Sequence, residues 1–324
     1  MKDLQCYPYS FLFVFLTLFV SNSCKSSKNS TSEISQWNYT EFRAKQQAFN
    51  SEDGAIKYID QGEGDVILLL HGIPTSSWLY RKMIEDISQK GYRVIAPDML
   101  GFGSSDNPKG YDIYAPKEHA KRILALMDSL HIKTWTHVTH DAGGLWTWEL
   151  LSESPERVSH LVLLNTVIYQ EGFNPPIKMK PGSFAKFSMW LYKNKSNSNI
   201  LLSQLFKKGL KENNLSESEI EGYKTPLKEG KNRAMCHFFS NTCNTFPDYS
   251  NVLKNCTIPT MVIWGKDDTM LEWTPQAEKV TQDLNIELNN IHLIDAKHFI
   301  PEEKPELINS YIFEFLSKDM AREN

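Results

Sequence analysis

Asp141 stands where a strand-like run meets a turn of small residues. The run covers residues 135–139, and the segment HDAGG follows it at 140–144, before a helical pattern. A strand, a sharp turn and a helix in this order form a nucleophile elbow, which presents one side chain at the carboxyl end of a sheet. Thr139 replaces the glycine that usually stands two residues before the nucleophile. Alone, Asp141 would equally suit a helix N-cap, but in an elbow it offers a carboxylate nucleophile.

Two later segments would bring an acid and a histidine to the same edge of the sheet. GKDD at 265–268 and AKHF at 296–299 each follow a short apolar run. The chain order nucleophile, acid, histidine is the order in which hydrolases built on such sheets carry their triads. His298 would then act as a general base, and Asp267 or Asp268 would fix its tautomer.

A fourth segment, HGIP at 71–74, follows the apolar run VILLL at 66–70. Its position predicts that the backbone N–H of Ile73 lies beside that of Ala142, where the two could donate to one developing oxyanion. Four such segments, each just past a strand, favour a catalytic site over four unrelated structural roles.

The elements that must position these residues follow an α/β pattern. From about residue 52, short strand-like runs alternate with helical patterns, which predicts mostly parallel strands joined by helices. The expected strands cover residues 56–60, 66–70, 93–97, 136–139, 161–165, 260–264 and 291–294.

Between residues 167 and 250 the strand pattern stops and helical signals replace it. Ser216 and Glu219 have the spacing of a capping box, which opens a helix. We therefore predict a core at 51–166 and 251–324 with a helical cap inserted at 167–250.

The composition favours an ordinary globular protein and excludes some functions. Apolar residues make up 41% of the 324 residues and the net charge is −4. No long run of Lys or Arg is present to neutralise a row of phosphates, so we expect no nucleic-acid partner. No Cys and His spacing indicates a metal site, and we expect neither a metal nor an organic cofactor.

The first 24 residues have the pattern of an export signal. Lys2 precedes an apolar run at 11–20, which is too short for a membrane-spanning helix of about 20 residues. Cys24 follows small and polar residues, so residues 1–24 resemble a bacterial lipoprotein signal with Cys24 as the lipidated residue. A polar tether would follow at 25–50. We expect an exported protein that is periplasmic or membrane-anchored; an ordinary signal peptide or an uncleaved anchor is the alternative.

The chain resembles the haloalkane dehalogenase and epoxide hydrolase branch of the α/β-hydrolase family. The resemblance begins near Gly54 and is carried by HGIPTSSWLYR at 71–81, APDMLGFGSSD at 96–106 and DAGG at 141–144. It implies an α/β-hydrolase fold, a mostly parallel sheet flanked by helices with an inserted cap. It also implies that Asp141 is the nucleophile and Asp268 the acid, with Asp267 a possible substitute.

The resemblance leaves the leaving-group donors open. Dehalogenases of this branch carry Trp directly after the nucleophile, and several carry Asn or Glu after His-Gly; this chain has Ala142 and Ile73 there. Trp190 in the cap is the candidate replacement. Epoxide hydrolases use cap tyrosines, for which the candidates are Tyr169, Tyr192, Tyr223 and Tyr249.

The substrate pocket is expected to lie between the cap and the core. We predict that Trp190, Tyr223 and Phe299 line it; Tyr223 begins YKTPL at 223–227, which is similar to a cap segment of the dehalogenases. Other candidate cap aromatics are Phe184, Phe187, Phe238 and Phe239. His137 and His140 flank the nucleophile strand, and we expect local hydrogen bonds to satisfy both.

A carboxylate nucleophile restricts the substrate. Attack on an sp³ carbon gives an ordinary ester that water can cleave, whereas attack on an ester carbonyl would give a high-energy anhydride. We therefore expect hydrolysis of carbon–halogen bonds in small apolar substrates, as in haloalkane dehalogenases. Epoxide hydrolysis is the first alternative, and an inactive hydrolase-fold protein that binds ligands is the second.

Overall fold

The computed structural model describes residues 38–175, 187, 195–212, 214–244 and 246–320. The predicted leader with Cys24, and also Phe184, Trp190 and Tyr192, lie outside the described residues.

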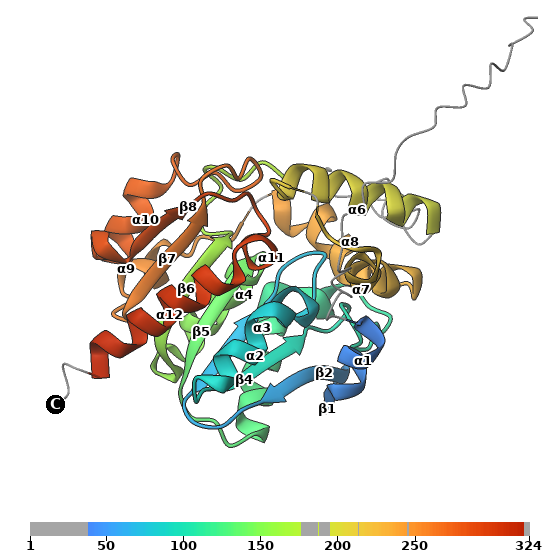
Figure 1. Cartoon of the computed structure of the whole chain (residues 1–324), viewed down its shortest axis with the longest axis horizontal. Helices are drawn as coiled ribbons and strands as arrows, with labels where there is room; N and C mark the ends of the chain where they lie inside the picture. The colour runs from blue at the N-terminus through green and yellow to red at the C-terminus, as the bar shows by residue number, and fades with distance from the viewer. Residues whose placement is uncertain (1–37, 176–186, 188–194, 213, 245, 321–324) are drawn as a thin grey trace, which may run out of the picture. The chain divides into compact units, whose positions relative to one another are not determined.

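The described strands form one eight-stranded sheet in the order β1-β2-β4-β3-β5-β6-β7-β8 (Figure 1). The strands from β3 to β8 run parallel, while β2 is antiparallel to both β1 and β4. The strand bounds are β1 Gln47–Ser51, β2 Gly54–Gln61, β3 Val66–Leu70, β4 Arg93–Asp98, β5 Trp135–Asp141, β6 Val158–Thr166, β7 Thr260–Gly265 and β8 Ile291–Ile294. All seven predicted strands are present, and the predicted α/β architecture is confirmed.

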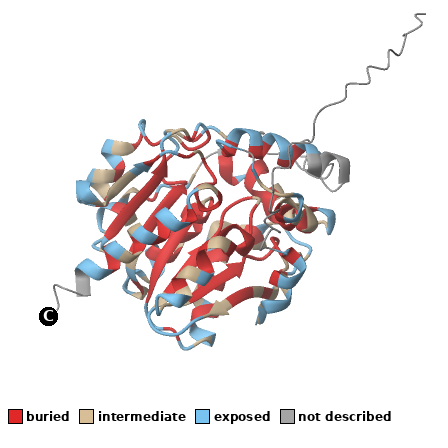
Figure 2. Cartoon of the chain, viewed as in Figure 1, coloured by how far each residue is buried: buried red, intermediate tan, exposed pale blue. Residues whose placement is uncertain are grey.

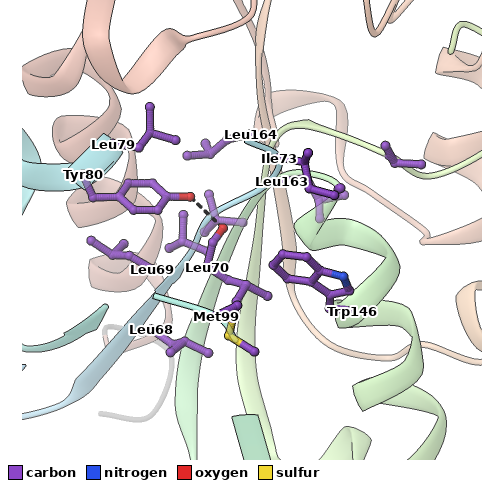
Figure 3. Packing of buried hydrophobic residues seen from close by; sticks show 14 of the residues in the cluster. Leu68, Leu69, Leu70, Ile73, Leu79, Tyr80, Met99, Trp146, Leu163 and Leu164 are labelled. Atoms are coloured by element: carbon purple, nitrogen blue, oxygen red, sulfur yellow. Dashed lines mark hydrogen bonds between the residues drawn. The ribbon is translucent and has the colours of Figure 1, made fainter. Parts of the chain in front are cut away.

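Both faces of the sheet centre are covered. Four consecutive residues of β3, from Ile67 to Leu70, are fully buried, and neighbouring strand residues point to opposite faces. Figure 2 shows this burial along the central strands, and Figure 3 shows how Leu68, Leu69 and Leu70 pack with their neighbours. The α-helices of the core are α1 Tyr39–Lys45, α2 Arg81–Gln89, α3 Pro116–Ser129, α4 Gly143–Glu153, α9 Ser250–Lys254, α10 Ala277–Asp283, α11 Ile300–Glu303 and α12 Pro305–Met320.

A helical segment separates β6 from β7, as expected from the loss of strand pattern. Its described α-helices are α6 Lys195–Gly209, α7 Glu217–Lys228 and α8 Arg233–Ser240, coloured yellow to orange in Figure 1. The predicted capping box is present at the start of α7, where the Ser216 hydroxyl accepts from the Glu219 N–H and the Glu219 carboxylate accepts from the Ser216 N–H. We call this segment the cap.

The prediction that a polar tether extends to residue 50 is wrong at its end. Residues 39–45 form α1 and residues 47–51 form β1, which pairs with β2. Tyr39 and Phe42 are buried and meet the Trp78 ring edge-on, with ring centroids 5.2 and 5.1 Å apart. Two aromatic residues in an otherwise polar stretch therefore pack α1 against the core.

Within the described ranges, no helix combines the length and apolar character needed to cross a bilayer. The same residues contain no group of three or more His, Cys, Asp or Glu side chains that could hold a metal ion.

Candidate active site

Asp141 lies at the turn between β5 and α4, as the elbow pattern predicts. Its backbone has φ of +51°, a left-handed conformation that residues other than glycine rarely adopt. A sparsely populated backbone conformation is often retained at a functional site, where it aims a side chain. Here it presents the Asp141 carboxylate at the end of the sheet, with 17% of the side chain exposed.

The two carboxylate oxygens of Asp141 have different surroundings. Oδ2 accepts hydrogen bonds from the backbone N–H of Ile73 at 3.0 Å and of Ala142 at 2.5 Å. Oδ1 lies 3.3 Å from Nε2 of His298. The predicted oxyanion donors therefore hold one oxygen, and the other oxygen is left beside the histidine.

Asp268, rather than Asp267, contacts the histidine. Its Oδ2 lies 2.8 Å from Nδ1 of His298, and its Oδ1 accepts from the backbone N–H groups of Met270 and Leu271 at 2.8 and 3.1 Å. Asp267 has a side chain that is 41% exposed and pairs with Lys211 at 3.0 Å. The structure thus brings Asp141, His298 and Asp268 together and places Asp267 outside the group.

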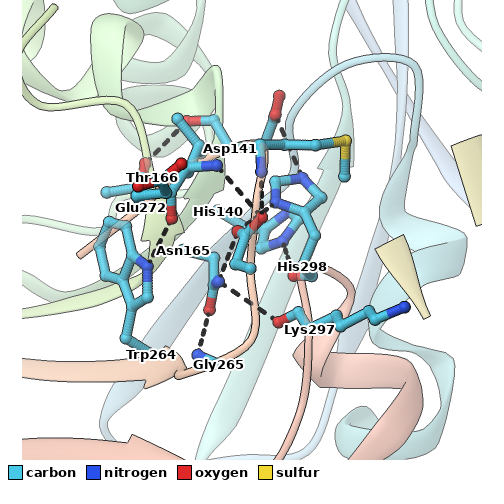
Figure 4. Close-up of polar contacts among 12 residues, drawn as sticks. His140, Asp141, Asn165, Thr166, Trp264, Gly265, Glu272, Lys297 and His298 are labelled. Carbon is cyan, nitrogen blue, oxygen red and sulfur yellow. Dashed lines mark hydrogen bonds and ion pairs between the residues drawn. The ribbon is translucent and has the colours of Figure 1, made fainter. Parts of the chain in front are cut away.

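Asn165 completes the group, and no motif in the sequence predicted its role. Its side-chain Nδ2 donates to Oδ2 of Asp268 at 2.7 Å. Its Oδ1 accepts from the Gly265 N–H at 2.9 Å (Figure 4). The backbone φ of Asn165 is +34°. A polar residue at the end of the buried run of β6 was the available signal, because it must find hydrogen-bond partners.

Electrostatics favour an ion pair in the resting site. Burial alone would lower the pKa of His298, but the Asp268 and Asp141 carboxylates outweigh burial and raise it to about 10. Burial alone would raise the pKa of Asp141, but the hydrogen bond and charge of His298 bring it below its ordinary value. His298 is therefore an imidazolium between two carboxylates at neutral pH.

An apolar cavity opens above this group. Its volume is about 40 Å³. Asp141 and His298 are the polar side chains among its described lining residues. The rest of that lining is Ile73, Pro74, Phe173, Pro175, Leu201, Leu205, Met235, Phe238, Phe239, Met270 and Leu271.

Two of the predicted pocket residues do not line the cavity. Tyr223 is buried and donates its hydroxyl to Oε1 of Glu302, which also pairs with Arg81, because a buried phenol needs an acceptor. Phe299 is fully buried and packs against the His298 ring and Phe206. The prediction that Tyr223 and Phe299 line the pocket is therefore wrong.

The remaining candidates divide between cavity, surface and the part not described. Phe238 and Phe239 line the cavity, whereas Phe187 is 53% exposed. The hydroxyls of Tyr169 and Tyr249 donate to Asp283 and Glu149, away from the cavity. Trp190 and Tyr192 lie outside the described residues. The described lining contains neither an indole N–H nor a phenol hydroxyl.

Comparison with known proteins gives consistent matches along most of the chain. A family model described as alpha/beta hydrolase fold matches residues 65–305. Haloalkane dehalogenase 2 of Mycobacterium tuberculosis is 30% identical over 281 residues, covering 82% of this chain and 93% of the relative. Epoxide hydrolase 3 of Xenopus tropicalis is 25% identical over 287 residues, covering 83% and 77%. The solved structure of an epoxide hydrolase from Vigna radiata superposes with a TM-score of 0.67 at 20% identity, covering 84% and 97%.

Proposed function

Because the chain belongs to the α/β-hydrolase family, we propose that it hydrolyses small apolar substrates through an alkyl ester on Asp141, with carbon–halogen cleavage as the reaction. One observation carries this proposal. Oδ2 of Asp141 is held by two backbone N–H groups, while Oδ1 lies beside His298, and both residues line the cavity. This arrangement suits a carboxylate that attacks with one oxygen and keeps the other in an oxyanion hole.

The first step forms the ester. Oδ1 of Asp141 attacks the sp³ carbon, the carbon–halogen bond breaks, and its electron pair leaves with the halide. Oδ2 becomes the ester carbonyl oxygen without leaving the N–H groups of Ile73 and Ala142. The apolar side chains of the described lining suit an apolar chain next to the reacting carbon.

The second step cleaves the ester. Esterification removes the negative charge of Asp141, which is one of the causes that raise the pKa of His298. The His298 imidazolium can then release its proton to solvent. The neutral ring takes a proton from water, and the water oxygen bonds to Cγ of Asp141. The oxyanion forms on Oδ2, where each N–H donor contributes about 3–4 kcal/mol in comparable sites, and Asp268 stabilises the imidazolium. Collapse breaks the Cγ–Oδ1 bond, and the leaving alkoxide takes the proton of the added hydroxyl and departs as the alcohol. The Asp141 carboxylate and the His298 imidazolium are thereby restored.

Epoxide hydrolysis is the alternative, and the charge of His298 favours it. An opening epoxide needs a proton on its leaving oxygen, and protonated His298 is the one side-chain N–H donor among the described residues that line the cavity. If His298 supplied that proton, it would become neutral and ready to activate water. Taking the proton from water would then restore the resting state with no net proton change.

A substrate panel separates the readings. Purified protein is incubated with short bromoalkanes, chloroalkanes and terminal epoxides, and halide and diol are measured. Halide release supports the dehalogenase proposal, and diol without halide supports the alternative. If no compound reacts but one raises the melting temperature, the inactive binding protein is the better account.

We also propose that Cys24 carries a lipid that attaches the mature protein to a membrane. The support is the sequence pattern of residues 1–24. Expression in a bacterial host with intact export, followed by intact-mass measurement, should give a chain that begins at Cys24 with added acyl groups. A chain that begins elsewhere and carries no acyl mass contradicts the proposal.

A further inference from the structure

Backbone N–H groups at His298 and Phe299 form hydrogen bonds to the cap. The backbone N–H groups of His298 and Phe299 both donate to the Gly209 carbonyl at 3.0 Å. Gly209 is the last residue of α6, the cap helix whose Leu201 and Leu205 line the cavity. The helix that forms part of the cavity wall therefore also holds the backbone of the proposed base.

The backbone carbonyl of His298 accepts a hydrogen bond from β5, the strand that carries Asp141. Nε2 of His140 lies 2.9 Å from the His298 carbonyl oxygen, and the two rings are 4.8 Å apart. Because a carbonyl only accepts, this contact requires the proton of His140 to be on Nε2. Burial and the His298 charge lower the pKa of His140 to about 4, so the ring is neutral at physiological pH.

The sequence predicted a local hydrogen-bond partner for His140, and this prediction is wrong. The partner, the His298 carbonyl, is 158 residues away along the chain. We propose that the His140 ring and the Gly209 carbonyl are positioning groups that clamp the His298 peptide between β5 and α6. The clamp fixes the His298 ring relative to the carboxylate of Asp141, the residue that directly follows His140. This inference rests on the proposed function, because it assigns His298 the role of the base.

The clamp matters because the base has little room for error. Nε2 of His298 must reach both Oδ1 of Asp141 and a water that attacks the ester, while Nδ1 keeps its contact with Asp268. In enzymes, misplacement of a reacting group by about 1 Å can cost about 100-fold in rate. A fixed peptide at His298 limits such displacement from both sides.

A set of variants of His140 tests the clamp. His140→Leu keeps the approximate volume and removes the donor, while His140→Gln keeps an N–H donor near the Nε2 position. His137→Leu is the matched control, because His137 lies on the same strand and is equally buried, but its ring contacts Trp135 and Thr147 instead.

Two measurements are made on the full-length variants. The first is the pKa of His298 by NMR titration, which needs no substrate. In His140→Leu it should fall below the wild-type value, because the ring moves away from the two carboxylates, while His140→Gln and His137→Leu should retain it. An unchanged His298 pKa in His140→Leu overturns the proposal.

The second measurement is the lifetime of the Asp141 ester in single turnovers with 1-bromobutane. We expect His140→Leu to slow ester cleavage by about 10- to 100-fold with little effect on ester formation, and His140→Gln to restore most of the rate. Equal slowing in His137→Leu would reveal a loss of folding stability only and count against the clamp. If wild type forms no ester, the proposed function fails, and the NMR result still decides the clamp.

Gly209→Ala tests the cap side. An added Cβ would lie 2.6 Å from the Phe299 ring, next to the peptide that Gly209 holds. We expect the same fall in the His298 pKa, and recovery when Phe299→Leu is added to relieve the contact. If the pKa of His298 in Gly209→Ala equals the wild-type value, Gly209 is not a positioning group and this part of the proposal is overturned.

Discussion

At Asp141, the division of labour between two oxygens of one carboxylate explains why both proposed steps can use the same residue. Oδ2 accepts from two backbone N–H groups before any substrate arrives, so the oxyanion hole is already aligned with the atom that will carry the charge. Oδ1 is the oxygen next to His298. A serine at this position has a single side-chain oxygen and could not occupy both the oxyanion hole and the position beside His298.

Neighbouring acids at residues 267 and 268 provide a matched test of the triad. Asp268→Asn should lower the rate of ester cleavage by about 10³- to 10⁴-fold, because an amide no longer fixes the His298 tautomer or stabilises its charge. Asp267→Asn should stay near the wild-type rate, since Asp267 pairs with Lys211 at the surface. Steady-state turnover of both variants measures this, and a strong defect in Asp267→Asn would contradict the assignment.

The charge state of His298 predicts how acid affects the two steps. Asp141 has a lowered pKa and stays ionised in mild acid, so ester formation should continue there. Ester cleavage needs neutral His298. The pKa of His298 falls once Asp141 is esterified, although the Asp268 carboxylate still raises it. Lowering the pH should therefore make the ester accumulate, visible by mass spectrometry after rapid quenching. Loss of both steps at the same pH would count against this order.

The loops at the carboxyl ends of β3, β5, β7 and β8 place the site. The sequence predicted them because each follows a short strand-like run, which in β3 is apolar without interruption. The sequence could not distinguish Asp267 from Asp268 as the acid. Both lie in one turn, and the path of the backbone there decides which carboxylate faces His298. The prediction from sequence missed β1, whose residues are exposed or partly buried and largely polar.

The cap was predicted only as a helical segment. Helical spacing shows which residues are buried but not which cavity they face, so the sequence could not distinguish Phe238, which lines the pocket, from Tyr223, which contacts Glu302. The long-range contact of His140 was equally hidden. Which distant carbonyl a buried ring meets depends on the completed fold.

The loop after β3 must approach the elbow closely, and Gly72 makes this possible. A Cβ added at Gly72 would lie 2.4 Å from Cβ and 2.6 Å from Oδ2 of Asp141. Gly72→Ala should therefore displace the carboxylate from its oxyanion donors and lower turnover by at least about 100-fold. Turnover is measured beside the melting temperature; a folded variant with wild-type turnover would contradict the geometry of the site.

For the molecule as a whole, the charge of His298 should make the free energy of unfolding depend on pH. The pKa of His298 is higher in the folded chain than the ordinary 6.5, so its protonation stabilises the fold fully below that pH. This contribution is lost as the pH rises towards about 10. The stability advantage of wild type over His298→Gln in urea unfolding should therefore shrink over that range. An advantage that grows with pH would contradict the imidazolium.

The central claim is that the carboxylate of Asp141 becomes bonded to the substrate, and a single turnover in ¹⁸O-labelled water tests it most directly. Cleavage of an Asp141 ester at Cγ should leave the label in the Asp141 carboxylate, found in the peptide that contains it, and unlabelled oxygen in the first alcohol. Label in the product alone, with Asp141→Ala still active, would contradict the account.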